Sequence, residues 1–217
     1  MKKITACLFD LDGVLVDTAK YHYLAWKELA DELGIVFTES HNELLKGVSR
    51  MDSLNIILNL GKLELQQTTK EELADKKNQV YLEYILKMEE DEILPGVRAF
   101  LTGLRERRIG VALGSASKNA PLILKRLHIA DLFDAVIDGT TVNKAKPDPE
   151  VFLKGAEALS AHPHECVVFE DAIAGVEAAK NAGMYCIGIG NPATLHQADL
   201  VISGFDGVLP EELFQKI

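Results

Sequence analysis

Long hydrophobic runs and an excess of basic residues are both missing from this chain of 217 residues. No stretch of 18 apolar residues occurs, so no membrane-spanning helix is expected. Lys2 and Lys3 precede an apolar stretch, but Asp10 interrupts it too early for a secretory signal. The 23 Lys and Arg against 33 Asp and Glu give a net charge of −10. Nucleic acid and anionic membranes, which both bind basic patches, are therefore not expected partners.

Cysteine is scarce, and its spacing excludes the usual cysteine-dependent sites. Cys7, Cys166 and Cys186 each lie inside an apolar, strand-like run. An odd number of widely spaced cysteines argues against a disulfide framework and against a zinc site. We expect reduced, buried thiols in a cytoplasmic protein.

Short apolar, β-branched runs alternate with helical patterns from about residue 93 onward. The strand candidates, including the opening strand, are residues 5–10, 109–115, 134–138, 165–171, 184–190 and 199–203. Helical spacing between them occurs at residues 97–108, 119–128, 149–160 and 172–183. Strands that are apolar on both faces and separated by helices predict an α/β fold with a doubly wound, Rossmann-like parallel sheet.

Residues 17–91 follow a different pattern, because they are helical throughout with no convincing strand. The helical stretches are residues 19–34, 41–47, 50–61 and 69–88. We interpret this block as a helical domain inserted into an α/β core formed by residues 1–16 and 92–217. The expected hinges are residues 14–19 and the acid-rich residues 89–96, which end in Pro-Gly.

Polar and charged side chains follow four separate strands of the predicted sheet. Ligands of an open parallel sheet bind beyond the carboxyl ends of its strands, so these side chains should share one edge. They are Asp10 and Asp12, Ser115, Lys146, and Glu170 with Asp171. A single Asp after a strand is most often a solvated turn residue, but the coincidence of these residues at one edge favours a site.

Carboxylates this close together raise one another's pKa unless a cation lies among them. A set of oxygen ligands suits Mg²⁺, which usually binds phosphate as well. One aspartate would then be free to act as a nucleophile that forms an aspartyl-phosphate. Ser115 and Lys146 would balance the charge of the transferring phosphoryl group. The pattern therefore predicts phosphoryl transfer.

Four stretches resemble, in the right order, the four motifs of the haloacid dehalogenase superfamily. They are "DLDGVLVDT", "LGSASKN", the lysine before "PDPE", and "FEDAIAGVEAA". The resemblance covers the whole chain once the helical block is taken as the cap domain of that superfamily. Within it, "YHYLAWKELADELGI", "LLKGVSRMDSL" and "SASKNAP" are similar to the β-phosphoglucomutase family.

This resemblance implies a reaction and a role for each residue of the predicted edge. The reaction would interconvert β-D-glucose 1-phosphate and β-D-glucose 6-phosphate through a phospho-aspartate and β-glucose 1,6-bisphosphate. Asp10 would be the nucleophile and Asp12 the general acid/base. One Mg²⁺ would be bound by Asp10, the Asp12 backbone carbonyl and Asp171, with Glu170 in the same shell. The transferring phosphoryl group would be held by Ser115, Ala116 and Lys146.

The resemblance also implies a second set of residues, which grip the remainder of the substrate. The second phosphate and the sugar would be bound by Gly47, Val48, Ser49, Arg50, Ser117, Lys118 and Asn119. The path along which the cap closes would be lined by Thr18, His22, Trp26, Ser53 and Lys77. Taken alone, Trp26 is more often a core residue and Arg50 a solvated one.

Two alternatives remain open at this point. A Mg²⁺-dependent phosphatase of small sugar phosphates would use the same residues with water as the acceptor, and Val16, where such mutases commonly carry Thr, favours it slightly. A mutase must exclude water and hold a second phosphate, for which the guanidinium of Arg50 is suited. A non-catalytic sugar-phosphate-binding protein is disfavoured because Asp10, Asp12, Lys146 and Asp171 are all present. A monomer is expected.

Overall fold

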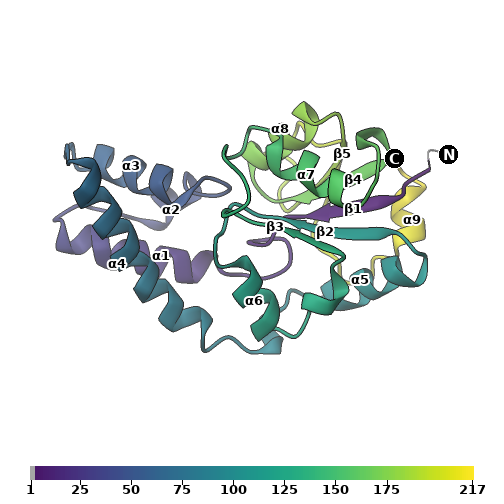
Figure 1. Cartoon of the computed structure of the whole chain (residues 1–217), viewed down its shortest axis with the longest axis horizontal. Coiled ribbons are helices and arrows are strands. Elements are labelled where there is room, and N and C mark those ends of the chain that lie inside the picture. The colour runs from purple at the N-terminus through teal and green to yellow at the C-terminus, as the bar shows by residue number, and fades with distance from the viewer. Residues whose placement is uncertain (1–2) are drawn as a thin grey trace.

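The computed structural model describes residues 3–217, so the first two residues of the predicted core segment lie outside it. One sheet of six parallel strands forms the centre of the larger part of the molecule (Figure 1). Its strands are β1 (Ala6–Phe9), β2 (Gly110–Gly114), β3 (Ala135–Ile137), β4 (Cys166–Glu170), β5 (Tyr185–Ile189) and β6 (Leu200–Ile202). Their order is β3-β2-β1-β4-β5-β6. Each lies within a predicted strand, and the doubly wound α/β sheet is confirmed.

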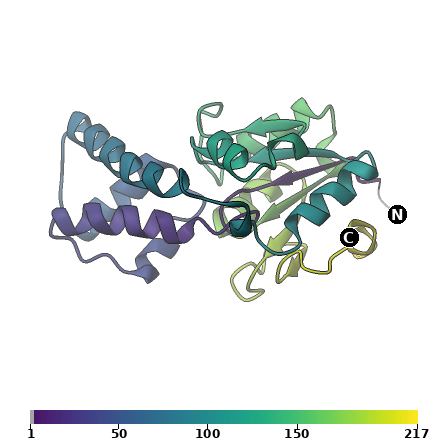
Figure 2. The same cartoon turned by 90° about the horizontal axis from the view of Figure 1, so that it is seen from below.

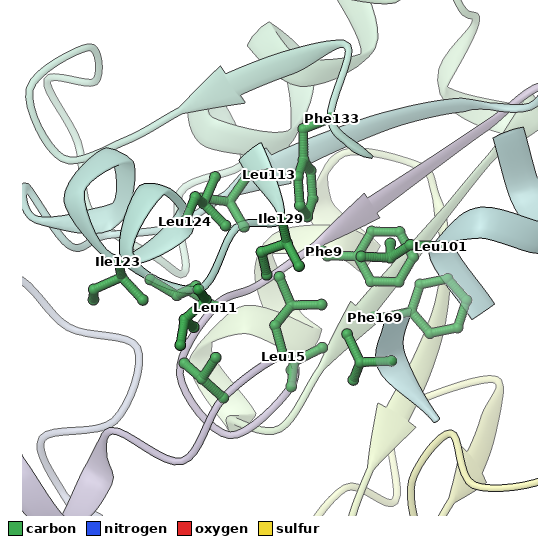
Figure 3. Close-up of a cluster of buried hydrophobic side chains, with 14 of the residues drawn as sticks. Phe9, Leu11, Leu15, Leu101, Leu113, Ile123, Leu124, Ile129, Phe133 and Phe169 are labelled. Atoms are coloured by element: carbon green, nitrogen blue, oxygen red, sulfur yellow. The ribbon is translucent and has the colours of Figure 1, made fainter. Parts of the chain in front are cut away.

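Alternate residues of β1 belong to different hydrophobic clusters, one on each face of the sheet. Cys7 and Phe9 belong to one cluster, and Ala6 and Leu8 belong to the other. Phe9 stacks on Phe169 of β4 with ring centroids 4.6 Å apart (Figure 3). Burial on both faces explains why this strand is apolar at every position.

Helices cover both faces of the sheet. The cluster around Phe9 takes residues from α5 (Val97–Glu106), α6 (Ala120–Arg126) and α9 (Pro210–Phe214). The opposite cluster takes residues from α7 (Glu150–Ala158) and α8 (Ile173–Asn181). Short 3-10 turns complete this part at η1 (Glu90–Glu92), η2 (Ala130–Leu132) and η3 (Pro163–Glu165). The sequence did not predict α9 or these turns, which are too short for a periodic signal.

The helical insert forms a separate body at one end of the molecule (Figure 2). Its helices are α1 (Ala19–Glu32), α2 (Glu39–Glu43), α3 (Arg50–Leu60) and α4 (Gln67–Ile85). They enclose their own hydrophobic cluster, which includes Trp26, Phe37 and Leu54. The prediction of a helix over residues 41–47 is wrong at both ends. Thr38 caps α2 by accepting a hydrogen bond from the His41 N–H, and turns follow α2 as far as Gly47, whose φ is +74°.

Two adjacent chain segments connect the insert to the sheet. Val16 and Ile93 form an isolated antiparallel bridge, and the Leu94 N–H donates to the Leu15 carbonyl over 2.9 Å. The Tyr21 hydroxyl donates to Glu92 over 2.6 Å, which joins α1 to the second segment. These contacts lie at the predicted junctions, and the domain boundaries themselves remain predictions.

Two further expectations concerned the burial of the cysteines and a membrane-spanning helix. Cys7, Cys166 and Cys186 are all buried and none forms a disulfide. Burial raises the pKa of each thiol, to about 11 for Cys166, so all three are protonated at neutral pH. Across residues 3–217, no helix combines the length and the apolar character that crossing a membrane requires.

Candidate active site

Asp10 and Asp12 leave the carboxyl end of β1 in a tight loop. The Asp10 N–H donates to the Phe169 carbonyl at 3.0 Å, which extends the β1–β4 pairing by one residue. Gly13 follows with a φ of +78°, and a Cβ on it would lie only 2.2 Å from Oδ2 of Asp171. Glycine is therefore required here for the loop to approach Asp171, which accounts for its place in the first motif.

Lys146 is buried between two carboxylates. Its Nζ lies 2.5 Å from Oδ1 of Asp10 and 2.6 Å from Oε1 of Glu170. Burial by itself would lower the pKa of Lys146, but Asp10 and Glu170 outweigh it and raise that pKa above its ordinary value. A Cβ on Gly175 would overlap the Glu170 carboxylate, so this glycine of α8 makes room for it. Lys146 thus carries a permanent positive charge beside Asp10.

Asp10, Glu170 and Asp171 form a group that could hold a metal ion, with one oxygen of each lying within 4.8 Å of the others. Burial, and then the charges of Glu170 and Asp10, raise the pKa of Asp171 to about 8. Burial also raises the pKa of Glu170 to about 7, with Lys146 opposing and Asp10 reinforcing the shift. So many buried acids repel one another unless a cation lies among them, and an oxygen-only donor set suits a hard divalent ion. The residues therefore fit a metal.

The turn after β2 presents backbone amides and hydroxyls at the same edge of the sheet. Ser115 is buried, and its Oγ accepts the Ser117 N–H at 3.1 Å. Ser117 Oγ in turn accepts the Asn119 N–H at 3.2 Å, just before α6 begins. Ser115, Ala116, Ser117, Lys118 and Asn119 all line one cleft. A turn of this kind, opening a helix, can bind an anion.

The insert supplies the opposite wall, and one of its residues contacts the predicted acid/base. The Thr18 hydroxyl donates a hydrogen bond to Oδ1 of Asp12. Burial, and then the charge of Asp10, raise the pKa of Asp12 to about 7. His22 faces a different partner within the described chain, because its Nδ1 lies 3.0 Å from Nζ of Lys77. Burial lowers the pKa of His22 well below its usual value, so this imidazole is neutral.

Lys77 is buried among aromatic rings. Its Nζ lies 4.6 Å from the ring centroids of both Trp26 and Tyr81. Burial, and then the positive charge of Arg50, lower the pKa of Lys77 to about 7. Trp26 is therefore both a core residue of the insert and part of the wall that faces the core domain.

The loop before α3 brings Arg50 to the cleft. Ser49 caps α3 by accepting the Asp52 N–H at 3.2 Å, and Arg50 is the first residue of that helix. Nη1 of Arg50 lies 3.9 Å from the exposed carboxylate of Asp75, a distance at which the ion pair is weak. A Cβ on Gly47 would lie 3.3 Å from the Cβ of Ala172, so this loop rests against the core.

A single cleft of about 620 Å³ brings the two walls together. Nearly all of the predicted site residues line it. The exceptions are Thr18, Lys146 and Glu170. Thr18 contacts Asp12, Lys146 contacts Asp10, and Glu170 contacts Lys146. The cleft thus has the clustered carboxylates and the turn after β2 on the core wall, and Lys46, Arg50 and Lys77 together with several acids on the insert wall.

The family model described as haloacid dehalogenase-like hydrolase matches residues 4–183. The chain belongs to this family. A β-phosphoglucomutase of Bacillus subtilis is 46% identical over 199 residues, which cover 91% of this chain and 88% of the relative. The crystal structure of a β-phosphoglucomutase from Clostridium difficile matches with a TM-score of 0.95 and 40% identity, covering 98% of this chain and 96% of that one.

A relative whose name gives another activity is also similar. A phosphorylated carbohydrates phosphatase of Thermotoga maritima is 34% identical over 184 residues, which cover 82% of each chain. The resemblance to the superfamily and to its β-phosphoglucomutases, inferred from the motifs, is confirmed.

Two contacts of this haloacid dehalogenase-like chain were not predicted. Nζ of Lys46 lies 3.6 Å from Oδ2 of Asp171, joining the insert to the acidic group of the core. Nδ2 of Asn119 donates to Oδ1 of Asn78 at 2.9 Å, joining the insert to the turn after β2. Lys46 lies within the "LLKGVSR" stretch, which is a signal that could have found it. Asn78 carries no such signal beyond its place next to Lys77.

Proposed function

We propose that the protein interconverts β-D-glucose 1-phosphate and β-D-glucose 6-phosphate as a β-phosphoglucomutase. The observation that carries this proposal is the pair of facing walls in one cleft. The phosphate-binding turn at Ser115 lies beside Asp10, and Arg50 lies on the insert across from it. A substrate with phosphate at both ends, such as β-glucose 1,6-bisphosphate, suits two such grips, whereas hydrolysis needs only one.

Asp10 is the proposed nucleophile, and Asp12 moves the proton. In the first half-reaction, the 6-hydroxyl of glucose 1-phosphate attacks phosphorus on phospho-Asp10 while Asp12 accepts the hydroxyl proton. The bisphosphate then turns around, Asp10 attacks the phosphorus at C1, and Asp12 returns its proton to the leaving sugar oxygen. The products are glucose 6-phosphate and phospho-Asp10, so the cycle closes. A pKa near 7 suits Asp12 for both directions of proton transfer.

The surrounding residues hold charge in place during this transfer. Lys146 faces the oxygen of Asp10 and, with Ser115 and the amides of the turn, would stabilise negative charge on the phosphoryl group. Mg²⁺, held by Asp10, Asp171 and the Asp12 carbonyl with Glu170 in its shell, would neutralise phosphate charge when bound. The Thr18 hydroxyl donates to Asp12, which supports a role in orienting that carboxylate.

A phosphatase is the second candidate, and the similarity to the Thermotoga maritima phosphatase favours keeping it. It would use Asp10 and Asp12 in the same way, with water attacking phospho-Asp10. One assay separates the two. The protein is incubated with Mg²⁺, β-glucose 1-phosphate and a trace of glucose 1,6-bisphosphate, while glucose 6-phosphate and free phosphate are followed together. Glucose 6-phosphate without stoichiometric phosphate supports the mutase, and phosphate without glucose 6-phosphate overturns it.

We also propose that the enzyme works as a cytoplasmic monomer on small phosphorylated sugars. The three unpaired, buried thiols support a reducing compartment. Both walls of the cleft come from one chain, so the site needs no second copy. Light scattering on a size-exclusion column tests the monomer, and a mass near 47.6 kDa, twice 23.8 kDa, would contradict it.

A further inference from the structure

The insert contacts the phosphate-binding turn of the core through one side-chain pair that the proposed chemistry does not use. Asn78 lies on α4 and Asn119 lies just before α6, 41 positions further along the chain. The Asn119 amide nitrogen donates to the Asn78 oxygen at 2.9 Å. Both residues line the cleft. The pair can form only when α4 and the turn are close, so it depends on the position of the insert relative to the core.

Asn119 is the last member of a short hydrogen-bonded series in that turn. Its backbone N–H donates to Ser117 Oγ, and the Ser117 N–H donates to Ser115 Oγ. The hydrogen bond between Asn119 and Asn78 therefore connects α4 to the end of the turn that would hold phosphate. Fixing the orientation of such donors before the substrate binds lowers the entropy lost on binding.

The second half of the Asn78 amide is available to a ligand. Its oxygen is occupied by Asn119, and no hydrogen bond within residues 3–217 uses its NH₂ group. Asn78 is half-buried and directly follows the buried Lys77. An amide NH₂ at the edge of an anion site is a neutral donor suited to a phosphate oxygen.

We propose that Asn78 is a positioning residue that couples the insert to the phosphate-binding turn. Its oxygen orients Asn119, and its NH₂ group donates to the phosphate of the substrate that lies away from Asp10. The coupling makes the grip on the second phosphate depend on contact between the two parts of the molecule. The identity of the ligand as a sugar phosphate rests on the proposed function.

Two variants of Asn78 and one control test this role. Asn78→Ala removes both hydrogen bonds. Asn78→Asp keeps an acceptor for Asn119 but replaces the donor with a negative charge. Gln79→Ala is the matched control, because Gln79 is exposed on the same helix and lies outside the cleft lining. Each variant is first shown to be folded by its thermal unfolding curve.

The readouts are KM and kcat for β-glucose 1-phosphate and the ratio of free phosphate to glucose 6-phosphate. Asn78→Ala should raise KM about threefold to tenfold, the loss expected for one or two neutral hydrogen bonds, and should raise the phosphate ratio. Asn78→Asp should raise KM further, because its carboxylate repels phosphate. Gln79→Ala should behave as the unaltered protein does.

Three results would overturn the proposal. If Asn78→Ala has the same KM and kcat as Gln79→Ala, Asn78 has no role in binding. If Asn78→Asp has a lower KM than Asn78→Ala, Asn78 does not contact the phosphate. A double-mutant cycle with Asn119→Ala should be non-additive, and additive losses would remove the coupling. If the unaltered protein releases phosphate but makes no glucose 6-phosphate, the mutase proposal fails. The KM comparison for phosphate release then still tests Asn78.

Discussion

Two buried lysines show how differently the core and the insert treat a charge. Lys146 lies between Asp10 and Glu170, both within 2.6 Å, and its pKa is raised. Lys77 lies against Trp26 and Tyr81, and in the part of the chain that the structure describes it forms no ion pair. Its pKa is lowered to about 7, because burial and Arg50 disfavour its charge.

This difference separates a buried lysine with two ionic partners from one that has none among the described residues. In the core, Lys146 is held by Asp10 and Glu170 before a substrate arrives, and the repulsion among the acids leaves room for a cation. The insert holds Lys77 and Arg50 near each other, with only the exposed Asp75 within ion-pair distance of Arg50 among the described residues. An anionic ligand in the cleft would supply the charge that the insert lacks. The core should therefore decide whether chemistry occurs, and the insert should decide which acceptor is used.

The largest expected effect comes from breaking the core wall. Asp10→Asn removes the proposed nucleophile, and both mutase and phosphatase activity should fall by at least about 10⁴-fold. Intact-mass measurement after incubation with glucose 1,6-bisphosphate should no longer detect a phosphorylated chain. Asp131→Asn, at an exposed position on η2, is the matched control and should keep full activity. Unchanged turnover in Asp10→Asn would end the whole scheme.

The next largest effect is expected from removing a phosphate contact of the insert while leaving the core unchanged. Arg50→Ala should lower mutase turnover about 10- to 150-fold, the loss expected when a charge-assisted phosphate contact is removed. Free-phosphate release should fall far less, because hydrolysis does not need the second grip. Arg50→Lys keeps the charge without the bidentate geometry, so its mutase turnover should lie between that of the unaltered protein and that of Arg50→Ala. Equal losses of both activities would contradict the proposed role of the insert.

The sheet could be predicted from the sequence because a strand buried on both faces is apolar over consecutive positions. A strand such as Ala6–Phe9, buried on both faces, is apolar at every position, and the edge where parallel strands end follows from the fold class. Residue pattern and fold class together were therefore enough to place Asp10, Ser115 and Asp171 at one site. The pattern also placed Lys146 at this edge, after a long loop that follows β3, but its position between the carboxylates of Asp10 and Glu170 was not predicted.

Contacts across the cleft could not be predicted from residue patterns. The pairs Lys46–Asp171 and Asn78–Asn119 depend on how the insert sits on the core, which no periodicity in either part records. The burial of Lys77 is of the same kind, since lysine on a helix is usually solvated. The catalytic and binding roles assigned to these side chains remain predictions, which substitution can test.

A smaller effect tests the uncompensated charge of the insert directly. Between pH 7 and 10.5, Lys77 is largely neutral when folded but protonated when unfolded, so stability rises with pH in this window. Lys77→Met removes the buried amine, and its stability gain should be greatest below pH 7. That gain should shrink by about 2–3 kcal/mol between pH 6 and pH 9, at roughly 1.4 kcal/mol per pH unit. Urea unfolding at the two pH values measures it, and a gain that does not vary with pH would contradict the lowered pKa.

The smallest effect concerns the hinge, the pair of chain segments that connects the insert to the core. The Tyr21 hydroxyl donates to Glu92 at 2.6 Å and so ties α1 to the second connecting segment. Tyr21→Phe should cost about 1 kcal/mol of stability and lower the midpoint of thermal unfolding by about 2–4 °C. Tyr84→Phe is the matched control, because its ring stacks on Tyr21 with centroids 5.4 Å apart, yet its hydroxyl has no hydrogen bond within residues 3–217. If calorimetry shows equal losses for both variants, the hydrogen bond from Tyr21 to Glu92 does not stabilise the hinge.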